Sequence, residues 1–505
     1  MEESLLLYSS LFIVFLLIFK LFLTKSKKLP PSRFALPILG HLHLLNQPLH
    51  RTLQNLSQKY GPIFSLKFGS KLVVVVSSSS AAEECLSKND LVLANRPHFT
   101  MNKYLGYNST TLVSSSYGEH WRNLRHITMV EVFSPKRLNM LTGVVRDEVK
   151  ILLGKLQRVS AVDKFTKVEL RPLISALTFN IITRMIAGKR FFGEEVDGNE
   201  EAKQFRQLVG EMFADGGGGY PGDFLPLIKY FDLTGYIKKV TNLGRRVDMF
   251  FQGLVDDVRR NKGSLESGNT MIGHLLSLQE SQPEQYTDEI IKGLALNMIA
   301  GGTHTVAATL EWAMSNLLNN SRVLKKARAE LDASLGSKKL VLDEIDRLSK
   351  LNYLQNIISE SSRLNPAAPL LVPHMSSDYC TIGGYNVPPN TIFLVNAWAI
   401  HRDQKIWDDP TCFNPERFGS NQVDAYKLLP FGVGRRACPG IGLANRTVGL
   451  TLGSLIQCFE WERVDGKEID MVEGSAGIAM PKLEPLDALC KTRSFMKDAL
   501  IQALN

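Results

Sequence analysis

The opening segment of the chain is almost uninterruptedly apolar. Residues 5–19 carry no charge, and the apolar run resumes after Lys20, so that it approaches the ~20 residues that a helix needs to cross a bilayer. Three lysines follow at 25–28, and positive charge after a span places the rest of the chain on the cytoplasmic side. A cleaved signal peptide is disfavoured, because acidic residues precede the run and no small-residue cleavage site follows it. The pattern predicts a retained anchor, one transmembrane helix, within residues 1–29.

Beyond the anchor, apolar residues recur at the spacings that are typical of the helices and strands of a folded domain. Residues 30–40 contain three prolines, which predicts a stiff hinge. Residues 63–77 read as two strands about a turn at Gly69, and a second strand-rich stretch spans 379–395. We therefore expect a mainly α fold with small β-sheets, in one large domain over residues 30–505. A helical period is clearest at residues 51–60, 147–156, 288–319 and 322–335.

Composition fits this picture and excludes several classes of protein. With 505 residues, 44% hydrophobic and 22% charged, the chain is long enough for a sizeable core and is not disordered by composition. Its six cysteines form no CxxC pair, which argues against a disulfide scaffold and for a reducing compartment. The formal net charge of +9 suits an anionic membrane or an acidic protein partner. Nucleic acid is not expected as a partner, because the basic residues are scattered and no nucleic-acid motif occurs.

A glycine-rich loop at residues 431–440, FGVGRRACPG, carries the strongest chemical signal. It presents Cys438 just before a helix of small residues that begins near Ile441. Backbone N–H groups and the positive end of a helix stabilise negative sulfur, and the neighbouring Arg436 adds to this effect or pairs with an anionic ligand. The environment predicts a thiolate at Cys438. The alternative is a buried, unreactive cysteine in a glycine loop.

The predicted helix over residues 288–319 has an unusual centre, AGGTHT at residues 300–305. Two glycines inside a helix each cost about 1 kcal/mol relative to alanine. We therefore expect either that another element packs closely on the backbone there or that a carbonyl of the helix is freed from its hydrogen bond.

Three shorter patterns accompany the cysteine loop. Glu360 and Arg363 lie three apart on one predicted helix, and Trp121 and Arg125 lie four apart on another. Arg417 falls in the segment FNPERF. Taken singly, each pattern has an ordinary explanation, such as a surface ion pair or an aromatic residue beside an arginine. Their joint occurrence around one cysteine loop favours a shared function.

The loop has the pattern FxxGxRxCxG, which resembles the haem-binding signature of the cytochromes P-450. The companions resemble the ExxR, PERF and WxxxR segments of that family and occur in the family's order. The resemblance implies the cytochrome P-450 fold, with haem b as the cofactor and the Cys438 thiolate as the ligand of its iron. It implies haem contacts for Arg436, Phe431, Gly434, Gly440, Trp121, Arg125 and His374, and a buried network that supports the haem fold for Glu360, Arg363 and Arg417.

The resemblance covers essentially the whole chain and is closest to one plant microsomal group, on segments 397–403, 427–440 and 450–463. That group includes isoflavone hydroxylases, lignan methylenedioxy-bridge enzymes and xanthone-forming phenol oxidases. It implies a haem-thiolate monooxygenase that hydroxylates, cyclises or couples a small aromatic specialised metabolite. The electrons would come from NADPH through NADPH–cytochrome P-450 reductase, with a cytochrome b-type protein as a further donor. The expected location is the endoplasmic reticulum membrane, with lipid around one span and the catalytic domain in the cytoplasm.

One position departs from the family pattern. Thr305 resembles the helix threonine that supports proton delivery, which makes it a candidate catalytic residue. The position before it is usually acidic but holds His304, and Val306 stands where a hydroxyl is common. A histidine, with a reference pKa of about 6.5, can pass protons near neutrality, so His304 is a second catalytic candidate. The alternative is that His304 only shapes the helix.

Selectivity in this family resides in loops and helix faces, so substrate contacts are expected from several separate segments. Two other functions remain open. An oxygen-independent haem-thiolate isomerase or dehydratase would need no reductase, and a non-enzymatic haem-binding membrane protein would need no catalytic threonine. Cys438 and Thr305 favour the monooxygenase, and dependence of turnover on a reductase would separate the three. The expected substrate-facing segments are 96–116, Met212 with Phe213, 301–305, 367–372 and 478–480.

Overall fold

The computed structural model describes residues 8, 9, 12, 28–160, 164–215, 219–261, 269–336, 339–419, 423–474 and 478–504. The anchor predicted within residues 1–29 lies almost wholly outside them. Within the described ranges, no helix combines the length and the apolar composition that crossing a membrane requires. The proline-rich segment is held against the first strand: the Ser65 amide donates to the Pro31 carbonyl (2.8 Å) and its hydroxyl to the Pro30 carbonyl (2.9 Å). This segment is therefore part of the folded body.

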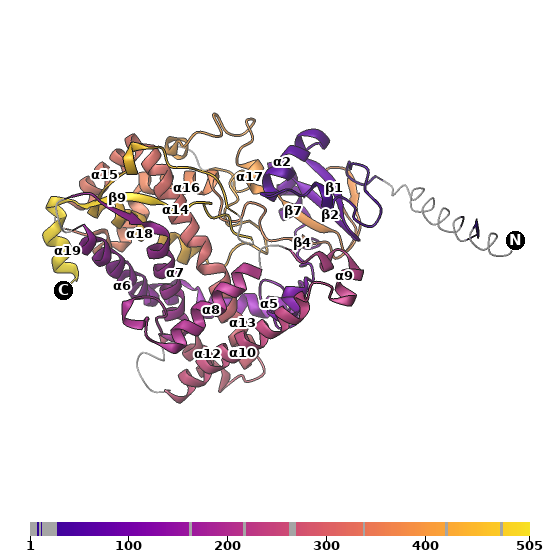
Figure 1. Ribbon diagram of the computed structural model, residues 1–505, viewed down its shortest axis with the longest axis horizontal. Helices are drawn as coiled ribbons and strands as arrows, with labels where there is room; N and C mark the ends of the chain where they lie inside the picture. The colour runs from indigo at the N-terminus through magenta and orange to yellow at the C-terminus, as the bar shows by residue number, and fades with distance from the viewer. Residues whose placement is uncertain are drawn as a thin grey trace.

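Helices make up most of the molecule, and the largest sheet lies at the end where the described chain starts (Figure 1). The predicted class, mainly α with small sheets, is confirmed. The α-helices of the described chain are α2 (Leu49–Tyr60), α3 (Ser79–Glu83), α4 (Thr100–Tyr104), α5 (Glu119–Ile127), α6 (Pro135–Val159), α7 (Leu170–Ala187), α8 (Glu200–Asp215), α9 (Pro226–Phe231), α10 (Tyr236–Arg260), α12 (Met271–Gln279), α13 (Asp288–Gly302), α14 (His304–Asn319), α15 (Ser321–Leu335), α16 (Asn352–Leu364), α17 (Ala397–Ile400), α18 (Ile441–Cys458) and α19 (Lys497–Leu504).

The largest sheet has four strands in the order β1-β2-β7-β4. Its β1–β2 hairpin is the one predicted from residues 63–77, and Gly69 adopts the positive φ of +54° in its turn. Strand β2 pairs in parallel with β7, and residues 73–76 are fully buried, as expected for an inner strand covered on both faces. The strands are β1 (Ile63–Phe68), β2 (Lys71–Val76), β3 (Thr166–Glu169), β4 (His374–Met375), β5 (Cys380–Ile382), β6 (Tyr385–Val387), β7 (Ile392–Val395), β8 (Phe459–Glu462) and β9 (Asp487–Thr492).

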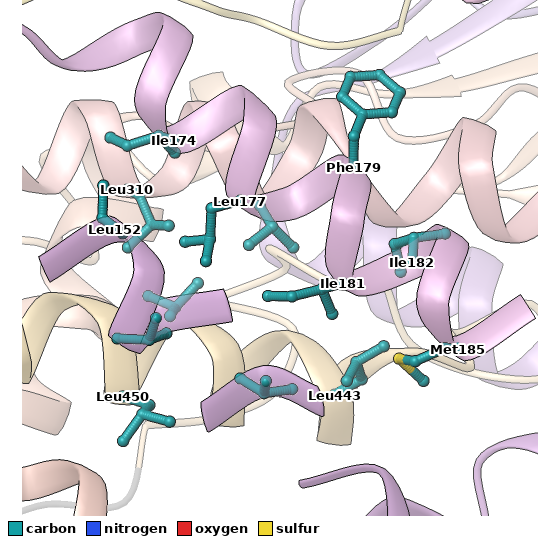
Figure 2. Packing of buried hydrophobic residues seen from close by; sticks show 14 of the residues in the cluster. Leu152, Ile174, Leu177, Phe179, Ile181, Ile182, Met185, Leu310, Leu443 and Leu450 are labelled. Atoms are coloured by element: carbon teal, nitrogen blue, oxygen red, sulfur yellow. The ribbon is translucent and has the colours of Figure 1, made fainter. Parts of the chain in front are cut away.

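The main apolar core lies between α6, α7, α14 and α18. Figure 2 shows Leu177 and Ile181 of α7 in one space with Leu152 of α6, Leu310 of α14 and Leu450 of α18. Each of these side chains is at most 3% exposed, and burying a Leu or Ile side chain stabilises the fold by about 1.5–3 kcal/mol. Because α18 starts directly after the cysteine loop, this core fixes the position of that loop.

The helix predicted over residues 288–319 is in fact two helices, α13 and α14, which meet at Thr303 (φ −100°, ψ −75°). The Thr303 hydroxyl donates to the Ile299 carbonyl (2.8 Å), and the Thr305 hydroxyl donates to the Gly301 carbonyl (2.6 Å). Threonine hydroxyls that bond back to carbonyls one turn earlier bend helices, which accounts for the break. A Cβ on Gly302 would lie 2.7 Å from Ile182 Cδ1, so one of the two glycines is explained by close packing.

Candidate functional site

The cysteine loop is held by its own backbone. The Cys438 amide donates to the Phe431 carbonyl (2.9 Å), and the Ala437 amide donates to the Gly434 carbonyl (3.1 Å). Gly434 has φ +78°, and a Cβ there would lie 2.7 Å from the carbonyl oxygen of Leu86, so only glycine fits. The pattern of the loop follows from this tight backbone.

Two other glycines of the loop differ from the expectation. Gly440 has φ −89°, and a Cβ there would lie 3.9 Å from Cys438 Sγ, an ordinary contact, so the protein atoms alone do not demand glycine at 440. Gly432 has φ +62°, a conformation that favours glycine, although no pattern in the sequence singled it out. The loop therefore uses left-handed backbone at 432 and 434.

The surroundings of the Cys438 sulfur act on its pKa in opposite directions. Burial raises the pKa of the Cys438 thiol, while the Gly440 amide and the charge of Arg125 lower it by less. A bound metal ion deprotonates a coordinating thiol outright, so the thiolate form depends on coordination.

Arg436, two residues before the cysteine, is directed away from solvent. Its guanidinium donates to three backbone carbonyls of segment 94–115 at distances between 2.5 and 3.2 Å. Its Cζ lies 4.3 Å from the centroid of the Trp121 ring, and the Trp121 Nε1–H donates to the Leu112 carbonyl (3.1 Å). Burial, and then the charge of Arg125, lower the pKa of Arg436 to about 10. The Trp121 ring thus packs directly on Arg436 of the loop.

Arg125, Arg96 and His374 complete this side of the site. Arg125 donates to the Ala437 carbonyl (2.8 Å), and Arg96 donates to the two carbonyls that precede His374 (2.7 and 2.8 Å). His374 Nδ1 donates to the Leu93 carbonyl (2.8 Å). Burial is the main cause that lowers the pKa of Arg96, to about 9, and the pKa of His374, to well below its usual value. The imidazole is therefore neutral.

We call the three arginines Arg96, Arg125 and Arg436 the buried cation cluster; Arg96 is buried, Arg125 and Arg436 are half-buried, and the neutral His374 lies beside them. Within the described ranges, none of the three arginines forms an ion pair with a carboxylate. All four residues line one cavity of about 510 Å³, which also contains Cys438. Buried guanidinium groups without acidic partners suit a ligand that carries anionic groups.

The predicted buried network of Glu360, Arg363 and Arg417 forms in the structure. The Arg363 guanidinium donates to both Glu360 carboxylate oxygens (2.7 and 2.8 Å), and Arg417 Nε donates to Glu360 Oε1 (3.1 Å). Glu360 and Arg363 are fully buried. Arg363 also donates to the carbonyls of His401 (2.6 Å) and Pro410 (2.7 Å). The network brings α16 and the segment 401–417 together, and its carboxylate and guanidinium groups are well satisfied.

His401 joins this network to the cysteine loop. Its Nδ1 donates to the Arg363 carbonyl (3.1 Å), and its Nε2 accepts from the Leu429 amide (2.8 Å), two residues before the loop. Burial is the main cause that lowers the pKa of His401 to about 3, with Arg402 and Arg363 adding to it. Sequence reasoning noticed segment 397–403 but assigned His401 no role, because its partners lie 38 and 28 residues away.

The break between α13 and α14 forms another wall of the same cavity. Gly301, His304 and Thr305 line it, and His304 is stacked on Phe213 of α8 with ring centroids 3.8 Å apart. The edge of Phe179 also meets the His304 ring, at 5.4 Å between centroids. Burial lowers the pKa of His304. The cavity takes residues from each of the expected substrate-facing segments but not every residue of them. Among those that do not line it are Thr303, Pro369, Leu370 and Met480.

A family model described as Cytochrome P-450 matches residues 30–486. The chain belongs to the cytochrome P-450 family. Its relatives include cytochrome P-450 81Q32 of Catharanthus roseus, 55% identical over 98% of both chains. Isoflavone 3′-hydroxylase of Medicago truncatula is 54% identical over 97% of this chain and 99% of its own. The (+)-piperitol/(+)-sesamin synthase CYP81Q2 of Sesamum radiatum is 52% identical over 95% of this chain and 93% of its own.

A solved structure supports the fold independently of the motifs. A zebra fish cytochrome P-450 determined with progesterone superposes with a TM-score of 0.74, at 24% identity, over 88% of this chain and 100% of its own. The cytochrome P-450 fold expected from the sequence is thus confirmed. As a member of this family, the chain is a monooxygenase that uses haem with a cysteine thiolate ligand and electrons from NADPH delivered through a reductase.

The residues present fit this cofactor. One cysteine faces a cavity that also holds the buried cation cluster, so a group with a metal centre and anionic substituents would find both kinds of partner. Arg96 belongs to this set, although it was expected only as part of a substrate-facing segment. Its role depends on carbonyls 276 and 277 residues away, which no local pattern reveals.

Proposed function

We propose that this chain is a membrane-bound haem-thiolate monooxygenase of aromatic plant metabolites and that Cys438 ligates the iron. The carrying observation is the cavity that Cys438 shares with Arg96, Arg125 and Arg436, which form no ion pair with a carboxylate in the described part of the chain. When bound, thiolate-ligated haem supplies the centre at which one atom of O₂ is transferred to a substrate. The other residues of the site then have the tasks of holding the cofactor, excluding water and moving protons.

The cofactor-binding roles follow from position. The haem propionates would be bound by Arg436, Arg125 and Trp121 together with His374 and Arg96, which lie on the same side of the site. Guanidinium groups bind carboxylates through paired, charge-assisted hydrogen bonds. Phe431, Gly434 and Gly440 would shape the loop around the sulfur, and Glu360, Arg363 and Arg417 would hold that loop through His401.

Proton delivery is assigned to the break between α13 and α14. The Thr305 hydroxyl donates to the Gly301 carbonyl (2.6 Å) and keeps its own lone pairs for a water on the cavity side. His304, with its lowered pKa, is a neutral imidazole near neutrality and could relay a proton. If replacing His304→Asp leaves both turnover and hydrogen peroxide release unchanged, the relay role is lost.

The substrate class is taken from the relatives and agrees with the cavity. The names of three relatives state isoflavone hydroxylation or piperitol and sesamin synthesis. The cavity, about 510 Å³, is walled largely by apolar side chains with a few hydroxyl and amide groups, a lining that suits an aromatic ligand. We infer oxidation of a phenolic aromatic compound, with hydroxylation, ring formation or coupling as possible outcomes of the same chemistry.

A membrane location is inferred from the sequence of residues 1–29 and from one apolar surface. Exposed apolar side chains occur on two segments. Ile38 in segment 34–39 is 80% exposed, and Tyr230 on α9 is 82% exposed. These two segments are neighbours: Gly69 donates to the Leu39 carbonyl (3.2 Å), and the next amide, of Ser70, donates to the Phe224 carbonyl (2.9 Å). Large exposed apolar patches mark membrane or protein contacts. We propose the endoplasmic reticulum membrane, with the body in the cytoplasm.

The reductase, and any cytochrome b-type donor, would dock on basic residues around the cysteine loop. Arg122, Lys136, Lys427 and Arg435 are exposed there. Complementary charge between an acidic donor and such a surface mainly raises the rate of productive encounter.

The test is a reduced, carbon-monoxide-bound difference spectrum of the membrane-expressed protein, followed by NADPH consumption with the reductase across phenolic aromatics. A thiolate-type Soret band with substrate-dependent NADPH use is expected. Turnover of hydroperoxides without reductase would instead indicate an isomerase or dehydratase. Absence of the thiolate-type band from folded, haem-loaded protein would refute Cys438 as ligand, and a matched Cys438→Ser variant provides the reference.

A further inference from the structure

His304 has a fixed tautomer. The Thr303 hydroxyl has a single hydrogen, and the Ile299 carbonyl, 2.8 Å away, can only accept it. The same hydroxyl oxygen lies 3.3 Å from His304 Nδ1, so Nδ1 must carry the hydrogen and donate to Thr303. A neutral imidazole has one hydrogen-bearing nitrogen, which leaves Nε2 as an acceptor. Burial lowers the pKa of His304 and so keeps the ring in this neutral form.

The orientation of the ring is also fixed. Phe213 of α8 stacks on it at 3.8 Å between centroids with an interplanar angle of 29°, and Phe179 of α7 meets it edge-on at 89°. Two aromatic contacts from different helices and a hydrogen bond at Nδ1 leave little freedom for rotation. In the described part of the chain, no group bonds to Nε2.

The surroundings of Nε2 favour a hydrogen-bond donor on the ligand. His304 and Phe213 both line the cavity, whose wall combines apolar side chains such as Ile182 and Val306 with a few hydroxyl groups such as those of Thr178 and Thr305. An acceptor beside apolar walls that stays unpaired when a ligand displaces water costs free energy, so a ligand that donates to it is preferred. A phenol combines a flat ring with a hydroxyl that is a strong hydrogen-bond donor, whereas the methyl ether of the same phenol has no hydrogen to donate.

We propose that His304 is a specificity residue whose Nε2 accepts a hydrogen bond from a phenolic hydroxyl of the substrate, so that the enzyme selects free phenols over their methyl ethers. This inference rests on the proposed function as an oxidase of aromatic compounds and deepens it. His304 thus replaces the usual acidic residue by an acceptor that bears no charge. Because Phe213 stacks on the imidazole, the direction of the hydrogen bond to Nε2 is fixed, and the substrate hydroxyl must approach from that direction.

The experiment compares a dihydroxyisoflavone with its dimethyl ether as probes of the haem-loaded enzyme. Dissociation constants come from the substrate-induced shift of the Soret band, with the carbon monoxide spectrum as the check of an intact site for each variant. His304→Phe keeps an aromatic ring on Phe213 but removes the acceptor, and His304→Gln places a carbonyl oxygen close to the position of Nε2. The ratio of the two dissociation constants is the readout, because it cancels general damage to the cavity.

We expect the wild-type preference for the dihydroxy probe to exceed that of His304→Phe by about threefold to tenfold, the effect of one net hydrogen bond, and His304→Gln to restore part of it. Equal ratios in wild type and His304→Phe would overturn the proposal. Equal ratios accompanied by raised peroxide release with both probes would assign His304 to proton relay instead. If the loaded wild type binds neither probe, the proposed substrate class fails, and this inference fails with it.

Discussion

Burial acts on Cys438 and His401 in the same physical sense, since it favours the neutral form of each. For the thiol this raises the pKa, and for the imidazole it lowers the pKa to about 3. The two residues are linked through the backbone: His401 accepts a hydrogen bond from the Leu429 amide, and the loop that follows Leu429 carries Cys438. A neutral His401 is therefore a condition for the loop to keep its place.

Stability should depend on pH through His401. In the unfolded chain a histidine titrates near 6.5, and in the folded protein His401 titrates at about 3. Between these values the unfolded state binds a proton that the folded state does not, so stability is complete above about 6.5 and falls as the pH is lowered toward about 3. Glutamine keeps a donor and an acceptor but does not titrate. We expect His401→Gln to show a smaller drop in melting temperature between about pH 7 and pH 5 than the wild type; equal drops would contradict this.

Within the loop, alanine at 434 and alanine at 432 form a matched pair. Both glycines have positive φ, near +78° and +62°, and share the conformational cost of about 1 kcal/mol. Only at 434 would a Cβ also meet a backbone carbonyl, at 2.7 Å, whereas at 432 its nearest contact is Leu371 Cδ1 at 3.9 Å. Gly434→Ala should lose about 1–3 kcal/mol more than Gly432→Ala through overpacking. The measurements are melting temperature and haem content, and similar losses in both variants would argue against the clash.

At the scale of elements, alternation and turn glycines were enough to predict the β1–β2 hairpin, and apolar periods predicted most helices. The glycines at 301 and 302 predicted either close packing or a freed carbonyl. The end of one helix at Thr303 was not predicted, because a threonine hydroxyl in a helix is equally compatible with a straight and a bent backbone. The roles of the motif residues of the site were predicted from their resemblance to the family's segments, because their spacing alone is equally compatible with ordinary surface pairs. Arg96 and His401 were not, because contacts between distant segments define their roles. The stack of His304 on Phe213 likewise depends on how α8 crosses the break.

The two glycines before the break should respond differently to alanine. A Cβ on Gly302 would lie 2.7 Å from Ile182 Cδ1, whereas one on Gly301 would meet nothing within 4 Å and would project into the cavity. Gly301→Ala should therefore keep or raise stability, by up to about 1 kcal/mol, while raising KM for bulky substrates. Gly302→Ala should lower the melting temperature through displacement of Ile182. Thermal unfolding and steady-state kinetics would test the pair, and the opposite order of stabilities would refute it.

At the scale of the whole molecule, positive charge around the cysteine loop should govern the encounter with the reductase. Reversing the charge of Lys427 and Arg435 together should raise the KM for reductase several-fold with little change in substrate binding, because encounter between charged surfaces depends on their complementarity. Lys71→Glu, an exposed charge on β2 in the sheet, is the matched control. Reductase titrations at low and moderate salt would show the effect shrinking with salt. An equal effect of the control would place docking elsewhere.

The buried cation cluster also bears on how much of this protein a cell can maintain. In the described part of the chain, three guanidinium groups line this cavity without a carboxylate partner, and this disfavours the folded chain until anionic groups join them. A ligand that binds only the folded state stabilises it in proportion to the logarithm of its concentration. Haem would then act as a folding partner as well as a catalyst, and a shortage of haem would first be seen as chains lost to degradation, before any change in the turnover of the molecules that remain.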